Sequence, residues 1–196
     1  MTTLDLSKAI AALANGEIIV YPTDTLYGLG ADIYNANAVR KVFEIKKRPM
    51  SNPLSVAVSS FKELEKIAFT DDKTRRLAES FLPGKLTLIL KKKDCISDVV
   101  TGGLDKVAVR IPDNEIALEL LSNFGPLTAT SANIHGRKTL GIISDISMQF
   151  EESDVSLYLD IGKLAGQPST IVDMTGKRIE IVREGAIAKR DILDAI

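Results

Sequence analysis

The stretch IIVYPTDTLYGLGA, from Ile18 to Ala31, joins a short apolar run to a proline, two threonines and two glycines. The apolar run predicts a buried strand that ends at Tyr21. The residues after Pro22 predict a capped single helical turn, in which Asp24 bonds forward and Gly28 ends the turn. The chain is therefore expected to pass directly from a buried strand into a polar turn.

Segments on both sides of this stretch alternate between helical and strand-like patterns, which is typical of an α/β domain. Short strands that follow one another closely near the C-terminal end predict hairpins, and hence a mixed sheet. The expected helices cover residues 6–14, 36–48, 61–67, 74–81, 114–123, 144–150 and 189–196, and the expected strands cover 18–21, 54–58, 86–90, 107–110, 127–130, 156–159, 170–173 and 179–182.

The 196 residues carry no linker or low-complexity segment, so we expect one domain over 1–196. No apolar run approaches the roughly 20 residues of a membrane helix, and we expect no membrane partner. The first residues contain Asp5 and lack a basic segment before their apolar part. Neither a secretory signal nor a transit peptide matches this pattern, and a cytoplasmic protein is expected.

The chain contains one cysteine, Cys95, and one histidine, His135. These numbers exclude an intramolecular disulfide and a zinc site built from cysteine and histidine. A Cys–His nucleophile pair stays formally open, although isolated cysteines are usually inert. The net charge of −1 creates no general attraction to nucleic acid, so any site for a polyanion must be local.

Cationic and hydroxyl side chains gather at the ends of the expected strands and in the loops that follow them. In open α/β sheets, ligands bind at such strand ends. A group of Lys, Arg, Ser, Thr and Asn without an acidic cluster predicts a site for an anion, most commonly phosphate. The segments are 23–25, 46–48 with Asn52, Lys106 with Arg110, 128–133, 169–170 and Arg183.

Each of these segments also has a local explanation. The basic residues at 46–48 could complement the negative end of a helix dipole, worth about 0.3–1 kcal/mol. Residues 128–133 could form a hydroxyl-containing turn or a helix cap. Arg110 and Arg183 could be strand residues that face solvent. The motifs taken singly do not decide between these explanations and an anion site.

Taken in order, the segments resemble the signature blocks of the YrdC/TsaC family of threonylcarbamoyl-adenylate synthases, from about Gly16 to Gly185. The blocks are YPTDTLYGLGADIYN, IKKRPMSNPLSV, FLPGKLTLIL, VAVRIP, LTATSANIHG, PSTIVD and IVREGAI. The resemblance implies a single-domain α/β fold with a twisted mixed sheet, flanking helices and a concave basic groove. It also implies an enzyme, a nucleotidyltransferase, which converts L-threonine, bicarbonate and ATP, with Mg²⁺, into threonylcarbamoyl-AMP and pyrophosphate. That product serves the N6-threonylcarbamoyladenosine modification of tRNA.

The resemblance assigns roles by position. It implies catalytic roles for Lys46, Arg48, Ser131 and Asn133, and L-threonine binding by Thr25, Arg110 and Ser169. It implies ATP binding by Arg48, Asn52, Lys106, Ala129, Ser131, Thr139 and Arg183. Two positions depart from the family pattern, because Ala57 stands where many members have histidine and Lys106 stands where threonine is frequent. No metal ligand is assigned, and Asp24 could orient Thr25 or assist Mg²⁺.

Two other functions compete with the synthase. The basic cluster Arg40, Lys41, Lys46, Lys47 and Arg48 could belong to a non-catalytic module that binds double-stranded RNA or tRNA, although no aromatic platform for bases accompanies it. A sugar-phosphate lyase-type enzyme on the same sheet is the other, and the lack of a compact set of acids and histidines argues against it. A tRNA threonylcarbamoyl transferase complex is a further possible partner that the resemblance implies.

Overall fold

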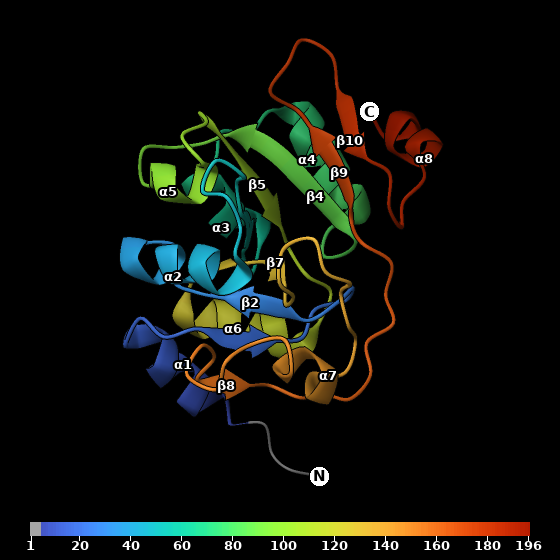
Figure 1. Ribbon diagram of the computed structural model, residues 1–196. Coiled ribbons are helices and arrows are strands. Elements are labelled where there is room, and N and C mark those ends of the chain that lie inside the picture. The colour runs from blue at the N-terminus through green and yellow to red at the C-terminus, as the bar shows by residue number, and fades with distance from the viewer. Residues whose placement is uncertain (1–4) are drawn as a thin grey trace.

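The strands of the chain form two sheets. The computed structural model describes residues 5–196. The four-stranded sheet has the order β7 (Thr130–Ser131), β2 (Gly28–Gly30), β1 (Ile19–Tyr21), β8 (Leu157–Tyr158). The six-stranded sheet has the order β10 (Glu180–Arg183), β9 (Thr170–Asp173), β4 (Leu86–Lys91), β5 (Lys106–Arg110), β3 (Ser55–Ala57), β6 (Leu127–Thr128). In Figure 1 the smaller sheet lies in the lower half of the molecule and the larger sheet in the upper half.

Both sheets are mixed, which confirms the predicted class. In the smaller sheet β1 pairs antiparallel with β2 and parallel with β8. In the larger sheet β3 pairs parallel with β5, and β4 pairs parallel with β9, while the other pairs are antiparallel. The prediction had one sheet, and the structure has two. Of the C-terminal strands only β9 and β10 form the expected hairpin, because β8 joins β1 instead.

Helices cover the sheets, and most begin at a side chain that caps their first turn. Asp5, Asn35, Ser60, Asp71, Ser97 and Asn114 each accept a hydrogen bond from a backbone N–H of the helix that follows. The helices are α1 (Leu6–Ala14), α2 (Ala36–Lys46), α3 (Phe61–Ile67), α4 (Asp72–Phe81), α5 (Asp98–Thr101), α6 (Glu115–Phe124), α7 (Ile143–Ser147) and α8 (Lys189–Asp194). They match the predicted helices within a few residues, and the short α5 was not predicted. In the described part of the chain, no helix combines the length and the apolar character that crossing a bilayer requires.

The opening stretch forms two strands rather than a strand and a helical turn. Gly28 and Gly30 lie within β2, so the prediction that Gly28 ends a turn is wrong. A Cβ atom at Gly30 would lie 3.0 Å from the ring of Tyr21, and one at Gly28 would lie 3.2 Å from it. The glycines therefore leave space for the Tyr21 ring over β2, and the Tyr21 hydroxyl donates to Thr128 O at 3.0 Å.

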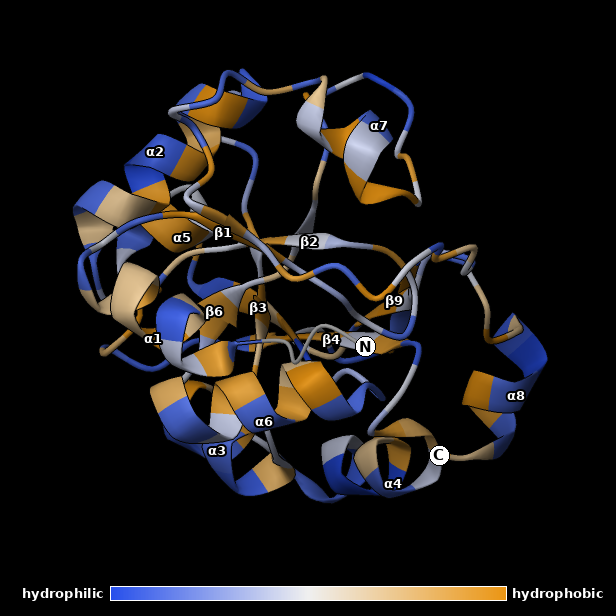
Figure 2. Cartoon of the chain, turned by 90° about the horizontal axis from the view of Figure 1, so that it is seen from below, coloured by the Kyte–Doolittle hydropathy of each residue, from blue (hydrophilic) through white to orange (hydrophobic). Residues whose placement is uncertain are grey.

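Strand β1 is buried on both faces. Ile18 and Val20 pack in a core with α2 and the larger sheet, whereas Ile19 and Tyr21 pack in a second core with α1 and α6. Figure 2 shows hydrophobic and hydrophilic residues alternating along α4 and α6, as expected for helices that cover a core on one side. The smaller sheet is thus the middle layer of this part of the molecule.

The predicted strand 127–130 is divided between the two sheets. Leu127 and Thr128 pair with β3, while Thr130 pairs with β2. Ala129 lies between them, and its N–H donates to Ser55 O at 2.7 Å. This short segment therefore contributes one strand to each sheet, and the pocket lies beside it.

Candidate active site

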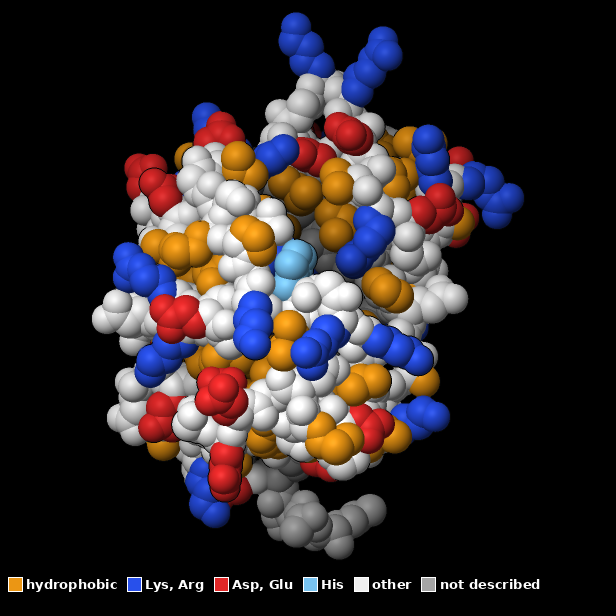
Figure 3. Space-filling view, in the orientation of Figure 1, with side chains coloured by type: hydrophobic (Ala, Val, Ile, Leu, Met, Phe, Trp, Pro, Cys, Tyr) orange, Lys and Arg blue, Asp and Glu red, His pale blue; other side chains and the backbone are white. Residues whose placement is uncertain are grey.

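A pocket with a cavity volume of about 350 Å³ lies between the two sheets. This volume is typical of a small-molecule site. One wall comes from the Thr23–Gly28 segment and β7, and the other comes from β3, β4, β5, β9 and β10. Figure 3 shows a hollow near the middle of this face, with Lys and Arg side chains on more than one side of it. Both sheets must be formed before this pocket exists.

The pocket lining carries three guanidinium groups, from Arg48, Arg110 and Arg183, and none of the described residues that line it is acidic. Burial lowers the pKa of Arg48, and burial together with the charge of Arg110 lowers the pKa of Arg183. Arg48 and Arg183 are therefore both partly desolvated, and Arg183 is also repelled by Arg110; an anionic ligand would offset both effects. The concave basic groove stays a prediction, and this pocket is where it would run.

The turn after β1 is closed by Thr23. Its Oγ1 atom accepts hydrogen bonds from the N–H groups of Thr25 and Leu26, both at 3.2 Å, and donates to Leu26 O at 2.6 Å. The prediction that Asp24 bonds forward to cap this turn is wrong, because its side chain points to Arg110 instead. Thr25 is buried, and its Oγ1 atom accepts from Arg110 Nη1 at 3.1 Å.

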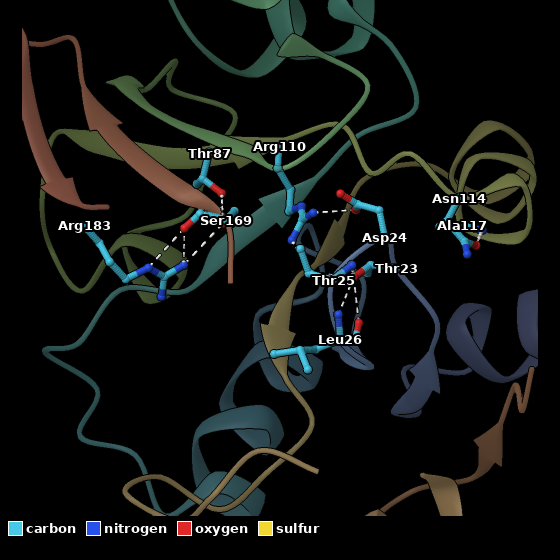
Figure 4. Close-up of polar contacts among 10 residues, drawn as sticks. All are labelled: Thr23, Asp24, Thr25, Leu26, Thr87, Arg110, Asn114, Ala117, Ser169 and Arg183. Carbon is cyan, nitrogen blue, oxygen red and sulfur yellow. Dashed lines mark hydrogen bonds and ion pairs between the residues drawn. The ribbon is translucent and has the colours of Figure 1, made fainter. Parts of the chain in front are cut away.

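Arg110 reaches the pocket from the end of β5 and forms a buried ion pair. Its Nη2 atom donates to Asp24 Oδ1 at 2.5 Å, and the two side chains are 7% and 6% exposed. Figure 4 shows Arg110 pointing toward Asp24 and Thr25 from the opposite side of the site. The alternative that Arg110 is a solvent-facing strand residue is therefore wrong.

Ser169 lies on the opposite wall in a small polar network. Its Oγ atom is 2.8 Å from Thr87 Oγ1, and Arg183 Nη2 donates to it at 3.3 Å. The Arg183 guanidinium also donates from Nε and Nη2 to the Ser169 carbonyl (Figure 4). Thr87 was not predicted as a site residue, and the signal for it was a hydroxyl within the apolar run of β4.

Lys46 holds the loop that contains Ser131 and Asn133. Its Nζ atom donates to Ser131 O at 2.5 Å and to Asn133 O at 2.6 Å, and the residue is only 2% exposed. Burial, and secondarily the charge of Arg48, lowers the pKa of Lys46 to about 7. Ser131 Oγ in turn donates to Asn133 Oδ1 at 2.5 Å. Lys46 thus holds the backbone of the pocket wall in place, so its role is not limited to complementing the dipole of α2.

Arg48 is anchored by backbone carbonyls. Its Nε atom donates to Asn52 O at 3.1 Å and its Nη2 atom to Pro53 O at 3.0 Å. Its Nη1 atom lies 3.4 Å from His135 Nδ1. These contacts hold the guanidinium at the pocket wall while leaving it without a carboxylate partner among residues 5–196.

The structure brings most of the predicted site residues together at the pocket. Those that line it are Thr25, Arg48, Arg110, Ala129, Ser131, Thr139, Ser169 and Arg183. Lys46 and Asn133 support one wall, as described above. The roles that the resemblance implies for all of these residues stay predictions.

Asn52 and Lys106 are not among the lining residues. Asn52 contributes its carbonyl to Arg48, and Lys106 Nζ binds Asp173 Oδ2 at 2.7 Å. The hydrogen bond to Asp173 raises the pKa of Lys106. ATP binding by these two residues stays a prediction, since their contacts in the structure lie with other groups.

Cys95 and His135 make separate contacts. The Cys95 thiol is exposed and lies 3.6 Å from Lys66 O, whereas His135 lies against Arg48. No hydrogen bond joins them in the described chain, so the structure gives no support to a Cys–His nucleophile pair. Within residues 5–196 no group of three or more His, Cys, Asp or Glu side chains could hold a metal ion.

The chain is similar to proteins of one family over most of its length. The Sua5/YciO/YrdC family model, described as "Telomere recombination", matches residues 11–185. A relative from Methanocaldococcus jannaschii is 42% identical over 176 residues, which are 89% of this chain and 83% of that protein. The threonylcarbamoyl-AMP synthase of Pyrococcus abyssi is 37% identical over 187 residues, which are 94% of this chain but only 55% of that protein.

The fold is similar to that of solved structures as well. The crystal structure of Pyrococcus abyssi Sua5 complexed with L-threonine aligns with a TM-score of 0.93 at 36% identity. The alignment covers 97% of this chain and 57% of that one. The chain thus spans little more than half the length of the Pyrococcus abyssi protein.

Proposed function

The chain belongs to the Sua5/YciO/YrdC family, and from this premise we propose that it is a threonylcarbamoyl-AMP synthase. The enzyme combines L-threonine, bicarbonate and ATP and releases threonylcarbamoyl-AMP, pyrophosphate and water. The observation that carries the proposal is the pocket between the sheets, in which Arg48, Arg110 and Arg183 converge with hydroxyl groups and without a lining carboxylate. Such a lining suits substrates that carry a carboxylate and a triphosphate.

We assign the two substrates to different parts of this lining. Arg110, with Thr25 beside it, supplies a planar guanidinium that suits the threonine carboxylate. Arg48 and the loop at Ser131 also line the pocket, and they would bind the triphosphate. The hydroxyl groups of Thr25 and Ser169 line the same pocket, and they would orient the amine and the substrate hydroxyl.

The main requirement of the reaction is stabilisation of the negative charge that develops in it. The threonine amine forms a C–N bond to bicarbonate with loss of water, and an oxygen of the resulting carbamate attacks the α-phosphorus as pyrophosphate leaves. Negative charge grows on the phosphoryl oxygens in this step, and fixed guanidinium groups in a partly desolvated pocket stabilise it. Positioning and charge stabilisation therefore suffice, and the single histidine need not act as a base.

Mg²⁺ is proposed to enter with ATP as its phosphate complex. Mg²⁺ usually binds to nucleotide phosphates and waters with one or two protein ligands, so it needs no cluster of carboxylates in the protein. The hydroxyl-rich lining near Ser131 is compatible with an ion delivered in this way. When bound, Mg²⁺ would neutralise part of the phosphate charge.

The remaining parts of the proposal concern the setting of the reaction. The product would pass to the tRNA threonylcarbamoyl transferase complex in the cytoplasm, for N6-threonylcarbamoyladenosine formation on tRNA. The competing RNA-binding module is weakened by one observation. Lys46, a member of its basic cluster, is buried and bound to two carbonyls, so it cannot reach RNA in this conformation.

The test is a product assay. Purified protein is incubated with ATP, L-threonine, bicarbonate and Mg²⁺, and adenylate product and pyrophosphate are measured. Pyrophosphate release should require both threonine and bicarbonate, and Arg48→Ala should weaken ATP use. Pyrophosphate release that does not depend on threonine would refute the proposed substrate. Full activity of Arg48→Ala would refute the assignment of Arg48 to triphosphate binding.

A further inference from the structure

Asp24 is a buried carboxylate beside the pocket, and the steps above give it no task. Its side chain is 6% exposed, and it is not among the residues that line the cavity. Its Oδ1 atom accepts from Arg110 Nη2 at 2.5 Å, and Arg110 does line the cavity. Asp24 therefore acts on the site through Arg110.

Two contacts fix the Arg110 guanidinium. Nη2 donates to Asp24, and Nη1 donates to Thr25 Oγ1 at 3.1 Å. Because the guanidinium is planar, two fixed nitrogens define both its plane and the edge that remains for a ligand. Both acceptors belong to the turn that Thr23 closes, so this short loop sets the direction of Arg110.

The ion pair is incompletely hydrogen-bonded. Asp24 Oδ2 and Arg110 Nε are both buried, and neither has a hydrogen-bond partner within residues 5–196. A pair that served stability alone would be expected to use these atoms in a second parallel hydrogen bond, since a buried pair helps only when its donors and acceptors are satisfied. The arrangement instead directs the guanidinium toward Thr25 and the pocket, which indicates a role in the site.

Asp24 is also distinctive among the charges near the pocket. In the described chain, Arg110 has a carboxylate within ion-pair distance, whereas Arg48 and Arg183 bind carbonyl groups. The one arginine that is expected to meet the amino-acid substrate is thus the one with an anionic anchor.

We propose that Asp24 is a positioning residue, which holds Arg110 so that its free N–H groups meet the carboxylate of an amino-acid substrate. This inference rests on the proposed function. It makes the acceptor oxygen at position 24 the essential feature, because that oxygen is what fixes Nη2.

The test compares Asp24→Ala, which removes the acceptor, with Asp24→Asn, which keeps an oxygen in its place. KM and kcat are measured for threonine and for ATP, and L-threonine affinity is measured by calorimetry. Asp24→Ala should raise the KM for threonine by about 10-fold or more, the effect of one lost charge-assisted contact, with the KM for ATP within about 2-fold. Asp24→Asn should restore the threonine KM to within about 3-fold of the wild-type value.

A double variant tests whether Asp24 works through Arg110. Adding Asp24→Ala to Arg110→Ala should raise the threonine KM no further than about 2-fold, because the group that Asp24 positions is already absent. The double variant also leaves no unpaired charge of this pair, so its comparison with Arg110→Ala shows whether Asp24 affects threonine binding without Arg110, even if Asp24→Ala alone does not fold. Asp71→Ala is the control for lost stability, since Asp71 caps α4 away from the pocket and should leave the threonine KM unchanged.

An unchanged threonine KM in Asp24→Ala, effects that multiply in the double variant, or equal losses in Asp24→Ala and Asp24→Asn would each overturn the inference. These outcomes differ from a failure of the proposed function. In that case the wild-type protein itself would form no adenylate product that depends on threonine.

Discussion

Lys46 is a buried lysine whose Nζ atom contacts carbonyl oxygens, with no carboxylate within ion-pair distance in the described chain. Burial lowers its pKa from 10.5 to about 7. Between these two pH values the unfolded chain holds a proton that the folded protein has released. The free energy of unfolding should therefore rise with pH across this window, by on the order of 5 kcal/mol in total from this residue.

Replacing Lys46 with methionine should remove this rise. Urea unfolding of the wild-type protein and of Lys46→Met from pH 7 to 9.5 measures the two slopes, and their difference isolates Lys46 from other titrating groups. Lys62→Met removes an exposed lysine of α3 and should keep the wild-type slope. Equal slopes for wild type and Lys46→Met would show that Lys46 stays protonated in the folded protein.

Thr87 is the second residue whose contribution can be tested by substitution, because its Oγ1 atom is hydrogen-bonded to the Ser169 hydroxyl at 2.8 Å. Thr87→Val keeps the shape of the side chain but removes this hydrogen bond, so that the Ser169 hydroxyl keeps only its contact with Arg183 Nη2 at 3.3 Å. The KM for threonine should rise by about 2- to 10-fold, the value of one neutral hydrogen bond, with little change in the KM for ATP. Steady-state kinetics measures both values.

Thr101→Val is a matched control for this change. Thr101 is fully buried in α5, and its hydroxyl has no hydrogen-bond partner in the described chain. The same substitution there should leave the kinetics unchanged and should raise the free energy of unfolding by up to about 1 kcal/mol, because an unsatisfied polar group is removed. An equal change in the threonine KM in Thr87→Val and Thr101→Val would show that Thr87 has no specific role in threonine binding.

At the scale of elements, the connection from β8 to β9 contacts the turn after β1. In Figure 1 this segment, coloured orange to red, runs along one side of the molecule from the lower to the upper half. Gly166 N donates to Thr25 O at 3.0 Å, and a Cβ atom at Gly166 would lie 2.6 Å from Thr25 Cα. This contact permits no side chain at position 166.

Gly166→Ala should therefore displace the backbone of Thr25. We expect a loss of about 1–3 kcal/mol in the free energy of unfolding and a rise in the threonine KM of about 10-fold or more. Denaturant unfolding and kinetics give the two values. In Gly176→Ala, in the turn between β9 and β10, the new Cβ atom would lie 3.3 Å from Arg178 O and 3.9 Å from Arg178 N, and the threonine KM should change by less than about 2-fold. If Gly166→Ala has wild-type kinetics, the β8–β9 connection accommodates the new methyl group without displacing Thr25.

The elements that the sequence predicted well are those with local signals. Helices such as α2 and α6 combine an apolar face with a capping side chain, both of which lie within a few residues of the helix. β2 was missed because its glycines make room for Tyr21, a contact that depends on strand pairing. The division of 127–131 between two sheets was missed for the same reason, since a continuous strand pattern does not say which partner each residue meets.

The site divides in the same way. Arg48, Arg110, Ser131 and Arg183, which line the pocket, belong to the cations and hydroxyls that gather at the expected strand ends and in the loops after them. That pattern alone left local explanations open, and the family resemblance singled these residues out. The partnership of Asp24 with Arg110, and that of Thr87 with Ser169, join residues more than 80 positions apart. Such pairs follow from the arrangement of the two sheets and have no local signal.

For the whole molecule, the position of the pocket links ligand binding to the stability of both sheets. A ligand at 100 times its Kd should stabilise the folded state by about 2.7 kcal/mol, which corresponds to a rise in Tm of about 5–10 °C for a chain of this length. Calorimetric scans with Mg·ATP should show this rise in one cooperative transition. Arg48→Ala should lose the shift, and two transitions of which one moves would show that the sheets unfold separately.

The order in which the strands of the two sheets follow one another along the chain has a consequence for recombination between genes. β1 and β2 belong to the smaller sheet, β3 to β6 to the larger one, β7 and β8 to the smaller one again, and β9 and β10 to the larger one. A genetic crossover at any single point within this order leaves neither sheet with all its strands from one parent, unless it falls before β3 or after β8. Recombination between diverged genes would therefore tend to mix strands within each sheet, and the pocket is best transmitted to descendants as one uninterrupted piece of sequence.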